Sequence, residues 1–270
     1  MGFDAAVGDA AEFTSKQGVL GMSLLDKTRP FSIREYFQPV LTTGDRSFVS
    51  DAEAIERKAA IENHEFFAIA MNSREALKFW AAQEAIVTNP FSQILLHVIG
   101  GIKNVHIRSI LMPVVAGEHS PIRNGIAGRS HPWLIWKLCR SLSLEEVDIF
   151  PSRAVSEFIA TLESTVDEPM RALGALGIGN ELMLLSEYKA VESCFEKAAP
   201  DAEYRDFLRA NIGEDEEHTK LIGTAAAALT ELGYDKGEFV RGAQLGVDAR
   251  VAYYGTLLEE FKSQNQQLQR

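Results

Sequence analysis

Helical periodicity runs through almost the whole chain, and it is the feature that most restricts the fold. From about residue 52 to residue 262, apolar side chains recur at the three- and four-residue spacing that puts them on one face of a helix. Strand patterns are scarce. The chain has 270 residues, 46% of them hydrophobic, and can bury a sizeable core. The sequence therefore predicts an all-α protein of about eight or nine helices.

The first part of the chain differs from the rest. Residues 1–49 are small, polar and glycine-bearing, with Pro30 and Pro39, and we interpret them as an N-terminal arm with one short helix near residues 33–40. A helical domain is then expected over residues 50–270. Its predicted helices cover residues 52–71, 74–88, 91–116, 131–142, 153–164, 169–197, 201–233 and 236–262. Pro90 is expected to separate the second helix from the third, and the helix over residues 169–197 is expected to be interrupted near Leu185.

The charge balance excludes several classes of partner. Lys and Arg number 27 against 38 Asp and Glu, which gives a net charge of −11. This sign disfavours nucleic acid and anionic membrane surfaces. Apolar runs such as residues 225–229 are far too short to span a membrane, and the N-terminus has no secretory signal pattern. With only two cysteines there is no disulfide framework, so we expect a cytoplasmic protein.

A polar cluster, NIGEDEEH at residues 211–218, lies inside a predicted helix. Asn211, Asp215 and His218 fall within about 60° of one another on one helix face. A carboxylate and an imidazole side by side on a helix form half of a metal site, which then needs ligands from other helices. Acidic runs on helices are more often solvated faces, and we interpret Glu216 and Glu217 in that way.

Glu181 stands in a very apolar segment, GALGIGNELMLL. A buried carboxylate costs several kcal/mol unless it has a partner, and a bound cation would remove that cost. A surface position or a pair with Lys or Arg is the alternative. Gly174, Gly177 and Gly179 on the same segment allow close helix packing or leave room for a ligand, and packing is the more common role.

Glu118 and His131 are predicted at the facing ends of two helices joined by a loop rich in Gly, Pro and Asn, while His119 is expected to be solvated. Each could also bond only locally. Glu118, His131, Glu181, Asp215 and His218 together supply three carboxylates and two imidazoles from four helices. That set suits a non-haem iron or manganese centre in a helical bundle and is too rich in oxygen for a structural zinc site.

These segments resemble the haem-oxygenase-like di-iron oxidases and oxygenases, relatives of thiaminase II (TenA) and of the pyrroloquinoline-quinone synthase fold. Residues 61–91 are similar to the family's opening pair of helices, and residues 108–148 to its helix with a ligand Glu, a loop and a ligand His. Residues 177–197 resemble the segment with a further ligand Glu. NIGEDEEHTKL matches the last two ligands of the motif His-x-x-x-Asp-x-x-His.

The resemblance implies a haem-oxygenase-like, TenA-like multi-helical bundle with one or two iron ions, or manganese. It places Glu118, His131, Glu181, Asp215 and His218 on ligand positions, and it places Asn211 where the family motif has histidine. A neutral amide is a poor iron ligand, so one metal site should be weakened. Glu214 could compensate if the helix were locally wound differently.

The implied function is an oxidase or oxygenase that uses O2 on a small amine, amino-acid or fatty-acid-like substrate, with a homodimer as a possible assembly. Aromatic side chains that could line the substrate cavity, or simply pack in the core, are Phe79, Trp80, Phe91, Trp133, Trp136 and Tyr188. Two alternatives remain open. One is a metal-free member of the fold that binds a small molecule. The other is a thiaminase II-like hydrolase with a cysteine nucleophile, although Cys139 and Cys194 look buried on helices without a neighbouring histidine.

Overall fold

The computed structural model describes residues 32–41, 44–119 and 130–268. Its contacts divide the chain between Ile33 and Arg34, and residues 34–270 form one compact unit. Every regular element in the described ranges is a helix, which confirms the predicted all-α class. Most of the predicted N-terminal arm lies outside the described residues, and the first long helix begins at Ser47, inside the range assigned to that arm.

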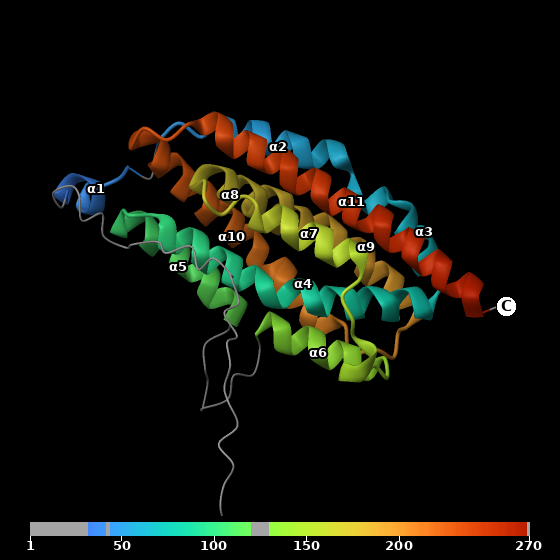
Figure 1. The fold of residues 1–270 in the computed structure, drawn as a ribbon. Coiled ribbons are helices and arrows are strands. Elements are labelled where there is room, and N and C mark those ends of the chain that lie inside the picture. Colours follow the sequence, from blue (N-terminus) through green and yellow to red (C-terminus); the bar gives the residue numbers. More distant parts are fainter. Residues whose placement is uncertain (1–31, 42–43, 120–129, 269–270) are drawn as a thin grey trace, which may run out of the picture. The chain divides into compact units, whose positions relative to one another are not determined.

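The elements follow one another as helices joined by short connections (Figure 1). In chain order they are α1 (Ile33–Phe37), α2 (Ser47–Ala59), η1 (Ile61–Asn63), α3 (Glu65–Ala70), α4 (Arg74–Gly101), α5 (Val105–His119), α6 (His131–Ser141), η2 (Glu146–Asp148), α7 (Arg153–Glu163), α8 (Pro169–Leu176), η3 (Gly177–Leu182), α9 (Met183–Ala198), α10 (Arg205–Glu231) and α11 (Lys236–Leu268). η1 and η2 are 3₁₀ turns, whereas η3 is a π-helical turn.

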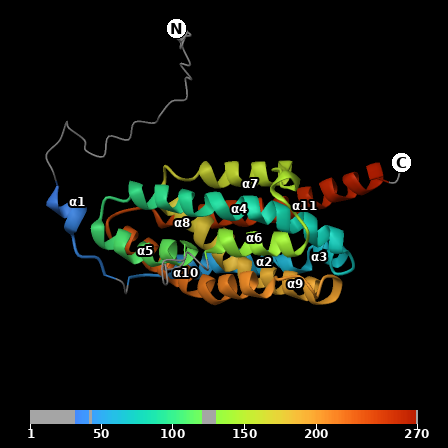
Figure 2. The same cartoon turned by 90° about the horizontal axis from the view of Figure 1, so that it is seen from below.

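The run α8–η3–α9 forms the centre of the bundle. α11 packs along α8 and η3 on one side and against α2 and α7, while α10 packs along η3 and α9 and against α5 (Figures 1 and 2). α4 contacts α5, α6 and α7. This arrangement brings the C-terminal end of α5, the N-terminal end of α6, η3 and the middle of α10 toward one region of the core.

Several predicted helix boundaries are wrong. The helix expected over residues 91–116 is divided, with α4 ending at Gly101 and α5 beginning at Val105. The break predicted at Pro90 is also wrong, and tertiary packing explains it. α4 continues through Pro90 to Gly101, although proline removes one backbone donor and crowds the preceding turn. Val87 and Phe91 are buried on either side of this proline, and so are Ile94 and Leu95 further along. Burial of this continuous apolar face keeps the helix intact where the local rule predicts an end.

Another error concerns residues 52–71, where one helix was expected. The helix α2 ends instead at Ala59, and its C-cap residue Ala60 adopts a left-handed conformation with φ of 48°. η1 and α3 follow, and the His64 side chain caps α3 by accepting a hydrogen bond from Phe66 N at 3.1 Å. Serine side chains cap two other helices, α4 and α7, whereas Ser130 before α6 makes no side-chain cap hydrogen bond. Ser73 accepts from Ala76 N at 3.1 Å, and Ser152 accepts from Val155 N at 3.3 Å.

Glycines let the central helices approach α11 closely. A Cβ atom added to Gly246 of α11 would lie 2.6 Å from Ala175 O and 2.9 Å from Gly179 Cα. Gly174 is equally crowded by the backbone of Phe239, and Gly177 by the side chain of Ile222 on α10. The glycines around Glu181 therefore serve helix packing, the more common of the two predicted roles.

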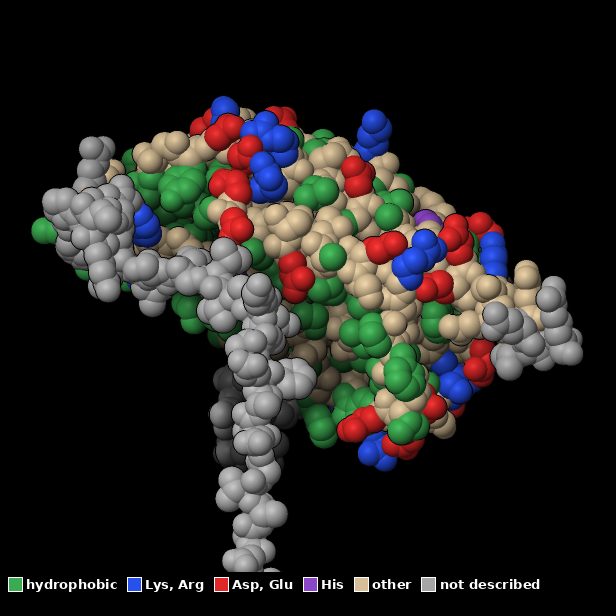
Figure 3. Space-filling view, in the orientation of Figure 1, with side chains coloured by type: hydrophobic (Ala, Val, Ile, Leu, Met, Phe, Trp, Pro, Cys, Tyr) green, Lys and Arg blue, Asp and Glu red, His purple; other side chains and the backbone are tan. Residues whose placement is uncertain are grey.

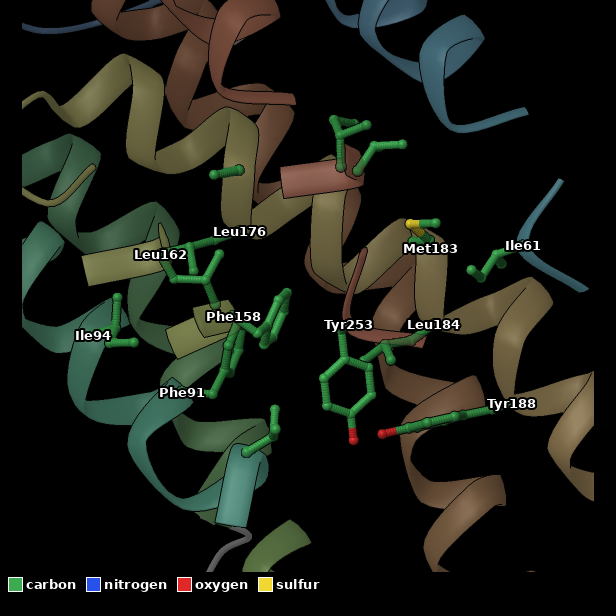
Figure 4. Packing of buried hydrophobic residues seen from close by; sticks show 14 of the residues in the cluster. Ile61, Phe91, Ile94, Phe158, Leu162, Leu176, Met183, Leu184, Tyr188 and Tyr253 are labelled. Carbon is green, nitrogen blue, oxygen red and sulfur yellow. The ribbon is translucent and has the colours of Figure 1, made fainter. Parts of the chain in front are cut away.

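The core between these helices is apolar and rich in aromatic rings. Figure 4 shows Phe91, Phe158, Tyr188 and Tyr253 packed among aliphatic side chains. On the surface view of Figure 3, acidic and basic side chains are interspersed rather than gathered into a patch of one sign. Among the helices of the described residues, none is both long enough and apolar enough to cross a membrane.

Candidate metal centre

The five predicted ligands with carboxylate or imidazole groups come from four different parts of the bundle. Glu118 lies in the last turn of α5, His131 begins α6, Glu181 lies in η3, and Asp215 and His218 lie one turn apart on α10. All five are buried, with 4% or less of each residue exposed. His119, next to Glu118, is exposed, as the sequence predicts.

Short distances join these side chains. His131 Nδ1 lies 3.1 Å from Glu118 Oε2, and His218 Nδ1 lies 3.2 Å from Glu181 Oε2 and 4.0 Å from Glu118 Oε1. Glu118, Glu181 and His218 each offer a ligand atom, and these atoms lie within 4.8 Å of one another. The Asp215 carboxyl lies beside Glu181, close enough for the two groups to interact.

Several polar atoms of this cluster have no hydrogen-bond partner. Within the described residues, Glu181 Oε1, Asp215 Oδ2 and His131 Nε2 are buried and make no hydrogen bond. Leaving a buried polar atom unsatisfied costs about 1–3 kcal/mol, and more for a charged group. A bound cation would supply the missing partner for all three atoms, since carboxylate oxygens and imidazole nitrogens are metal ligands.

The electrostatics of the cluster favour added positive charge. Burial raises the pKa of Asp215 well above its ordinary value, and the charges of Glu181 and Glu118 raise it further. Burial opposes protonation of His131, but the neighbouring Glu118 and Glu214 carboxylates outweigh it and raise its pKa to about 10. Without a metal the cluster therefore holds protons, and a divalent cation would take their place.

Local backbone features position two of these ligands. Glu181 is carried by the π-helical turn η3, which interrupts an otherwise α-helical segment; such turns are rare and recur at functional sites. The interruption predicted near Leu185 is therefore wrong by about one turn. At Gly117, an added Cβ would overlap the imidazole of His218 and lie 2.9 Å from Glu214 Oε2, so the glycine makes room for the ring.

Asn211, which stands where the resemblance expects histidine, is buried on the same face of α10. Its amide Nδ2 donates a hydrogen bond to Phe207 O at 2.7 Å, which leaves the amide oxygen as the atom that could act as a metal ligand. Asn211 also lines a cavity next to Glu118 and Glu181. The volume of this cavity is about 20 Å³, which is room for about one water molecule.

The six aromatic residues that were expected to line a substrate cavity do not lie together in the structure. Phe91 and Tyr188 do line the small cavity beside Glu118. Trp80 is buried and donates to Tyr254 OH at 2.9 Å, while Phe79 lines a different, open hollow near Phe261. Trp133 is 49% exposed and Trp136 packs at the edge of the core.

Sequence reasoning missed a buried ionic network on the far side of the same cavity. Arg250 of α11 is fully buried; its Nη2 donates to both oxygens of Glu84 at 3.0 Å and 3.1 Å, and its Nε donates to Glu187 at 2.7 Å. Tyr188 OH donates to Glu84 at 2.9 Å, and Glu84 and Tyr188 both line the cavity. The signal was a charged residue in each of the apolar segments FWAAQEAIV and ARVAYY.

The two cysteines lie in environments that oppose a reactive thiolate. Both are buried, and Cys139 Sγ donates to Ala81 O at 3.3 Å while Cys194 Sγ donates to Phe67 O at 3.4 Å. Burial raises the pKa of Cys139 to about 12 and that of Cys194 to about 11. A nucleophilic cysteine needs a lowered pKa or an adjacent base, so these environments do not favour catalysis by either thiol.

Fold and site together define a class, an all-α bundle with a buried group of carboxylate and histidine side chains. The profile of a family described as iron-containing redox enzymes matches residues 78–251, and the chain belongs to that family. The matched segment contains all the predicted ligands. No curated protein matches the chain at a significant level.

Solved structures of similar fold agree with this assignment. A CADD-like protein of unknown function from Nostoc punctiforme, solved at 2.00 Å, is 19% identical with a TM-score of 0.63, over 79% of this chain and 96% of that one. Its 1.35 Å structure gives 17% identity and a TM-score of 0.62, over 81% and 96%. A TenA homologue from Pseudomonas syringae is 12% identical, with a TM-score of 0.61 over 79% and 92%. These likenesses confirm the TenA-like helical fold.

Proposed function

We propose that the protein is a non-haem iron-dependent oxidase or oxygenase that uses O2 to oxidise a small amine, amino-acid or fatty-acid-like substrate. The observation that carries the proposal is the convergence of Glu118, Glu181 and His218 from three helices, with ligand atoms within 4.8 Å of one another. Membership of a family of iron-containing redox enzymes supports the choice of metal.

The donor set fits iron. Carboxylate oxygens and imidazole nitrogens suit iron and manganese, and the absence of a thiolate among these residues argues against a structural zinc site. Glu118, Glu181 and His218 would hold the ion, with Asp215 and His131 completing the site. Bound iron would supply the redox chemistry needed to activate O2.

The surrounding side chains would control access to this centre. The cavity beside Glu118 and Asn211 has room for a molecule of about the size of water or O2, but not for an organic substrate. Gly117 and Glu214 border the cluster and are only half-buried, unlike the five ligands. A larger substrate would therefore approach the centre from the side of Gly117 and Glu214.

Metal content after anaerobic loading with Fe(II) tests the proposal. We expect at least one iron per wild-type chain by elemental mass spectrometry, and consumption of O2 when the loaded protein meets air. Glu181→Gln and Asp215→Ala should lose most of the metal. Glu217→Gln, on the exposed face of α10, serves as a control of equal charge change and should load normally. A wild-type protein without stoichiometric metal would overturn the proposal.

Asn211 favours one alternative, a degenerate site in a protein that binds a small molecule without oxidising it. A neutral amide in place of an imidazole weakens a metal site, and a small molecule could then bind beside it from the side of Gly117 and Glu214. Native mass spectrometry of the purified protein would decide between the two. A co-purified organic molecule together with no O2 consumption after iron loading favours the binding protein. Light scattering of the same sample would test the proposed homodimer.

A further inference from the structure

We propose that Glu214 is an additional ligand of the metal centre and takes the place of the histidine that the family resemblance expects at position 211. This inference rests on the proposed metal site and adds one carboxylate to it. It concerns the residue three positions after Asn211 on α10.

The helix geometry places Glu214 on the ligand-bearing face. At about 100° per residue, Glu214 lies about 60° from Asn211 on one side, and Asp215 lies about 40° away on the other. His218 falls between them. Because α10 is continuous from Arg205 to Glu231, no local rewinding is required, in contrast to the condition suggested by the sequence.

The side chain of Glu214 reaches the cluster. Its Oε2 lies 3.5 Å from His131 Nε2. A Cβ added to Gly117 would lie 2.9 Å from the same oxygen and would overlap the ring of His218. The Glu214 carboxylate and two imidazoles therefore gather over the space that Gly117 leaves open.

His131 gives independent support for a ligand at this place. The residue is 1% exposed, and in the described part of the chain its Nε2 has no hydrogen-bond partner, while Nδ1 is held by Glu118. Two atoms that each bond one ion at about 2.1 Å lie about 3.0 Å apart at a right angle and about 4.2 Å apart when opposite. The distance of 3.5 Å between His131 Nε2 and Glu214 Oε2 falls inside that range.

The adjacent acidic residues are different and provide matched controls. Glu216 and Glu217 are exposed, and Glu216 pairs with Lys220 at 2.8 Å on the solvent side of α10. Replacing Glu217 removes the same charge from the same helix without touching the cluster. If negative charge on α10 promotes metal uptake in general, replacing either Glu214 or Glu217 should weaken it. If Glu214 is a ligand, only its replacement should weaken metal binding.

The experiment compares Co(II) and Mn(II) affinity, by visible absorption and by competition with a chelator, in the wild type and in Glu214→Gln, Glu214→Asp, Glu217→Gln and Glu181→Gln. We expect Glu214→Gln to bind about 10–100 times more weakly, as loss of a metal-supporting group does. Glu214→Asp should also weaken binding, because its carboxylate cannot reach as far. Adding Asn211→His to Glu214→Gln should restore part of the affinity, and Glu217→Gln should match the wild type.

The outcomes separate this inference from the proposed function. If Glu181→Gln loses metal while both Glu214 variants bind like the wild type, Glu214 is not a ligand and the iron site itself stands. If the wild type binds neither ion, the proposed function and the inference fall together. Circular dichroism of the metal-free proteins checks folding, which Glu214→Gln should retain because it removes one of several like charges from the cluster.

Discussion

Asp215 shows how one residue of a ligand cluster can lower the stability of the metal-free protein and still favour metal binding. Its carboxyl is buried next to Glu181 and Glu118, so its pKa in the folded protein lies above that in the unfolded chain. In the metal-free protein, the free energy of unfolding therefore falls as the pH rises from the unfolded-state pKa of this carboxyl through its folded-state pKa. It is recovered as the pH falls again to the unfolded-state pKa. A bound cation would reverse this penalty.

Asp215→Asn should therefore stabilise the metal-free protein at neutral pH, because the amide is neutral in the unfolded chain as well and takes up no proton on folding. For a domain of this size, each kcal/mol shifts Tm by about 2–4 °C, and we expect a rise of at least that size. The same variant should lose the increase in Tm that Mn(II) produces in the wild type. Differential scanning calorimetry with and without Mn(II) measures both effects, and a metal-free variant less stable than the wild type would contradict the explanation.

Individual residues differ in how well the sequence predicts them. Glu181 could be singled out because a carboxylate in an apolar segment must find a partner. Gly117 gave no comparable signal, since its role depends on the ring of His218 about a hundred residues away in the chain. Arg250 does stand out as a charged residue in an apolar segment, but its two carboxylate partners come from α4 and α9, and the sequence alone does not pair them with it.

Among the helices, the packing of η3 against α11 links the fold to the site. Gly246 lets α11 approach the segment that carries Glu181, and an added Cβ would lie 2.6 Å from Ala175 O. The contact atoms are backbone, so they cannot move aside in the way that a flexible side chain can. The close approach of these two helices is therefore expected to help to position Glu181.

Gly246→Ala should lower the free energy of unfolding by about 1–3 kcal/mol, the usual cost of overpacking a core, and should weaken metal binding through η3. Gly255→Ala is the matched control on the same helix, because no atom lies within 4 Å of its added Cβ. The control should be neutral or stabilising by up to about 1 kcal/mol, since alanine favours the helix. Urea unfolding and Co(II) titration of both variants check this, and equal behaviour of the two would refute the role of the contact.

Helix type and most helix positions followed from periodicity and capping residues, whereas interruptions did not. Pro90 does not end the helix as the local preference of proline predicts, because the buried residues on both sides of it stabilise α4. The π-helical turn lies about one turn before the predicted interruption, in a segment whose glycines pack closely against α10 and α11, and such long-range contacts leave no local sequence pattern.

For the molecule as a whole, the ion network around Arg250 ties α4, α9 and α11 together behind the candidate metal site. Two carboxylates share one buried guanidinium, which also lies 4.8 Å from the ring centroid of Tyr253. Burial raises the pKa of Glu187, and the charge of Arg250 opposes that shift.

Arg250→Met should be strongly destabilising, by about 3–5 kcal/mol, because it leaves Glu84 and Glu187 buried without a cation. Arg241→Met provides the contrast, since Arg241 pairs with Asp235 and Glu238 at the surface, with 57% of its side chain exposed. Exposed pairs contribute about 0–1 kcal/mol. Chemical denaturation of both variants measures the difference, and a similar small loss in each would show that the network is not a structural support.

The central claim is that the buried carboxylates and histidines bind a metal ion, and anomalous diffraction tests it most directly. Crystals grown with Fe(II) under anaerobic conditions, measured on both sides of the iron absorption edge, should show an anomalous peak bounded by Glu118, Glu181 and His218. The Glu214 carboxylate should turn toward the same peak. A crystal without a peak at this position, in which these side chains bond only to one another, would contradict the claim.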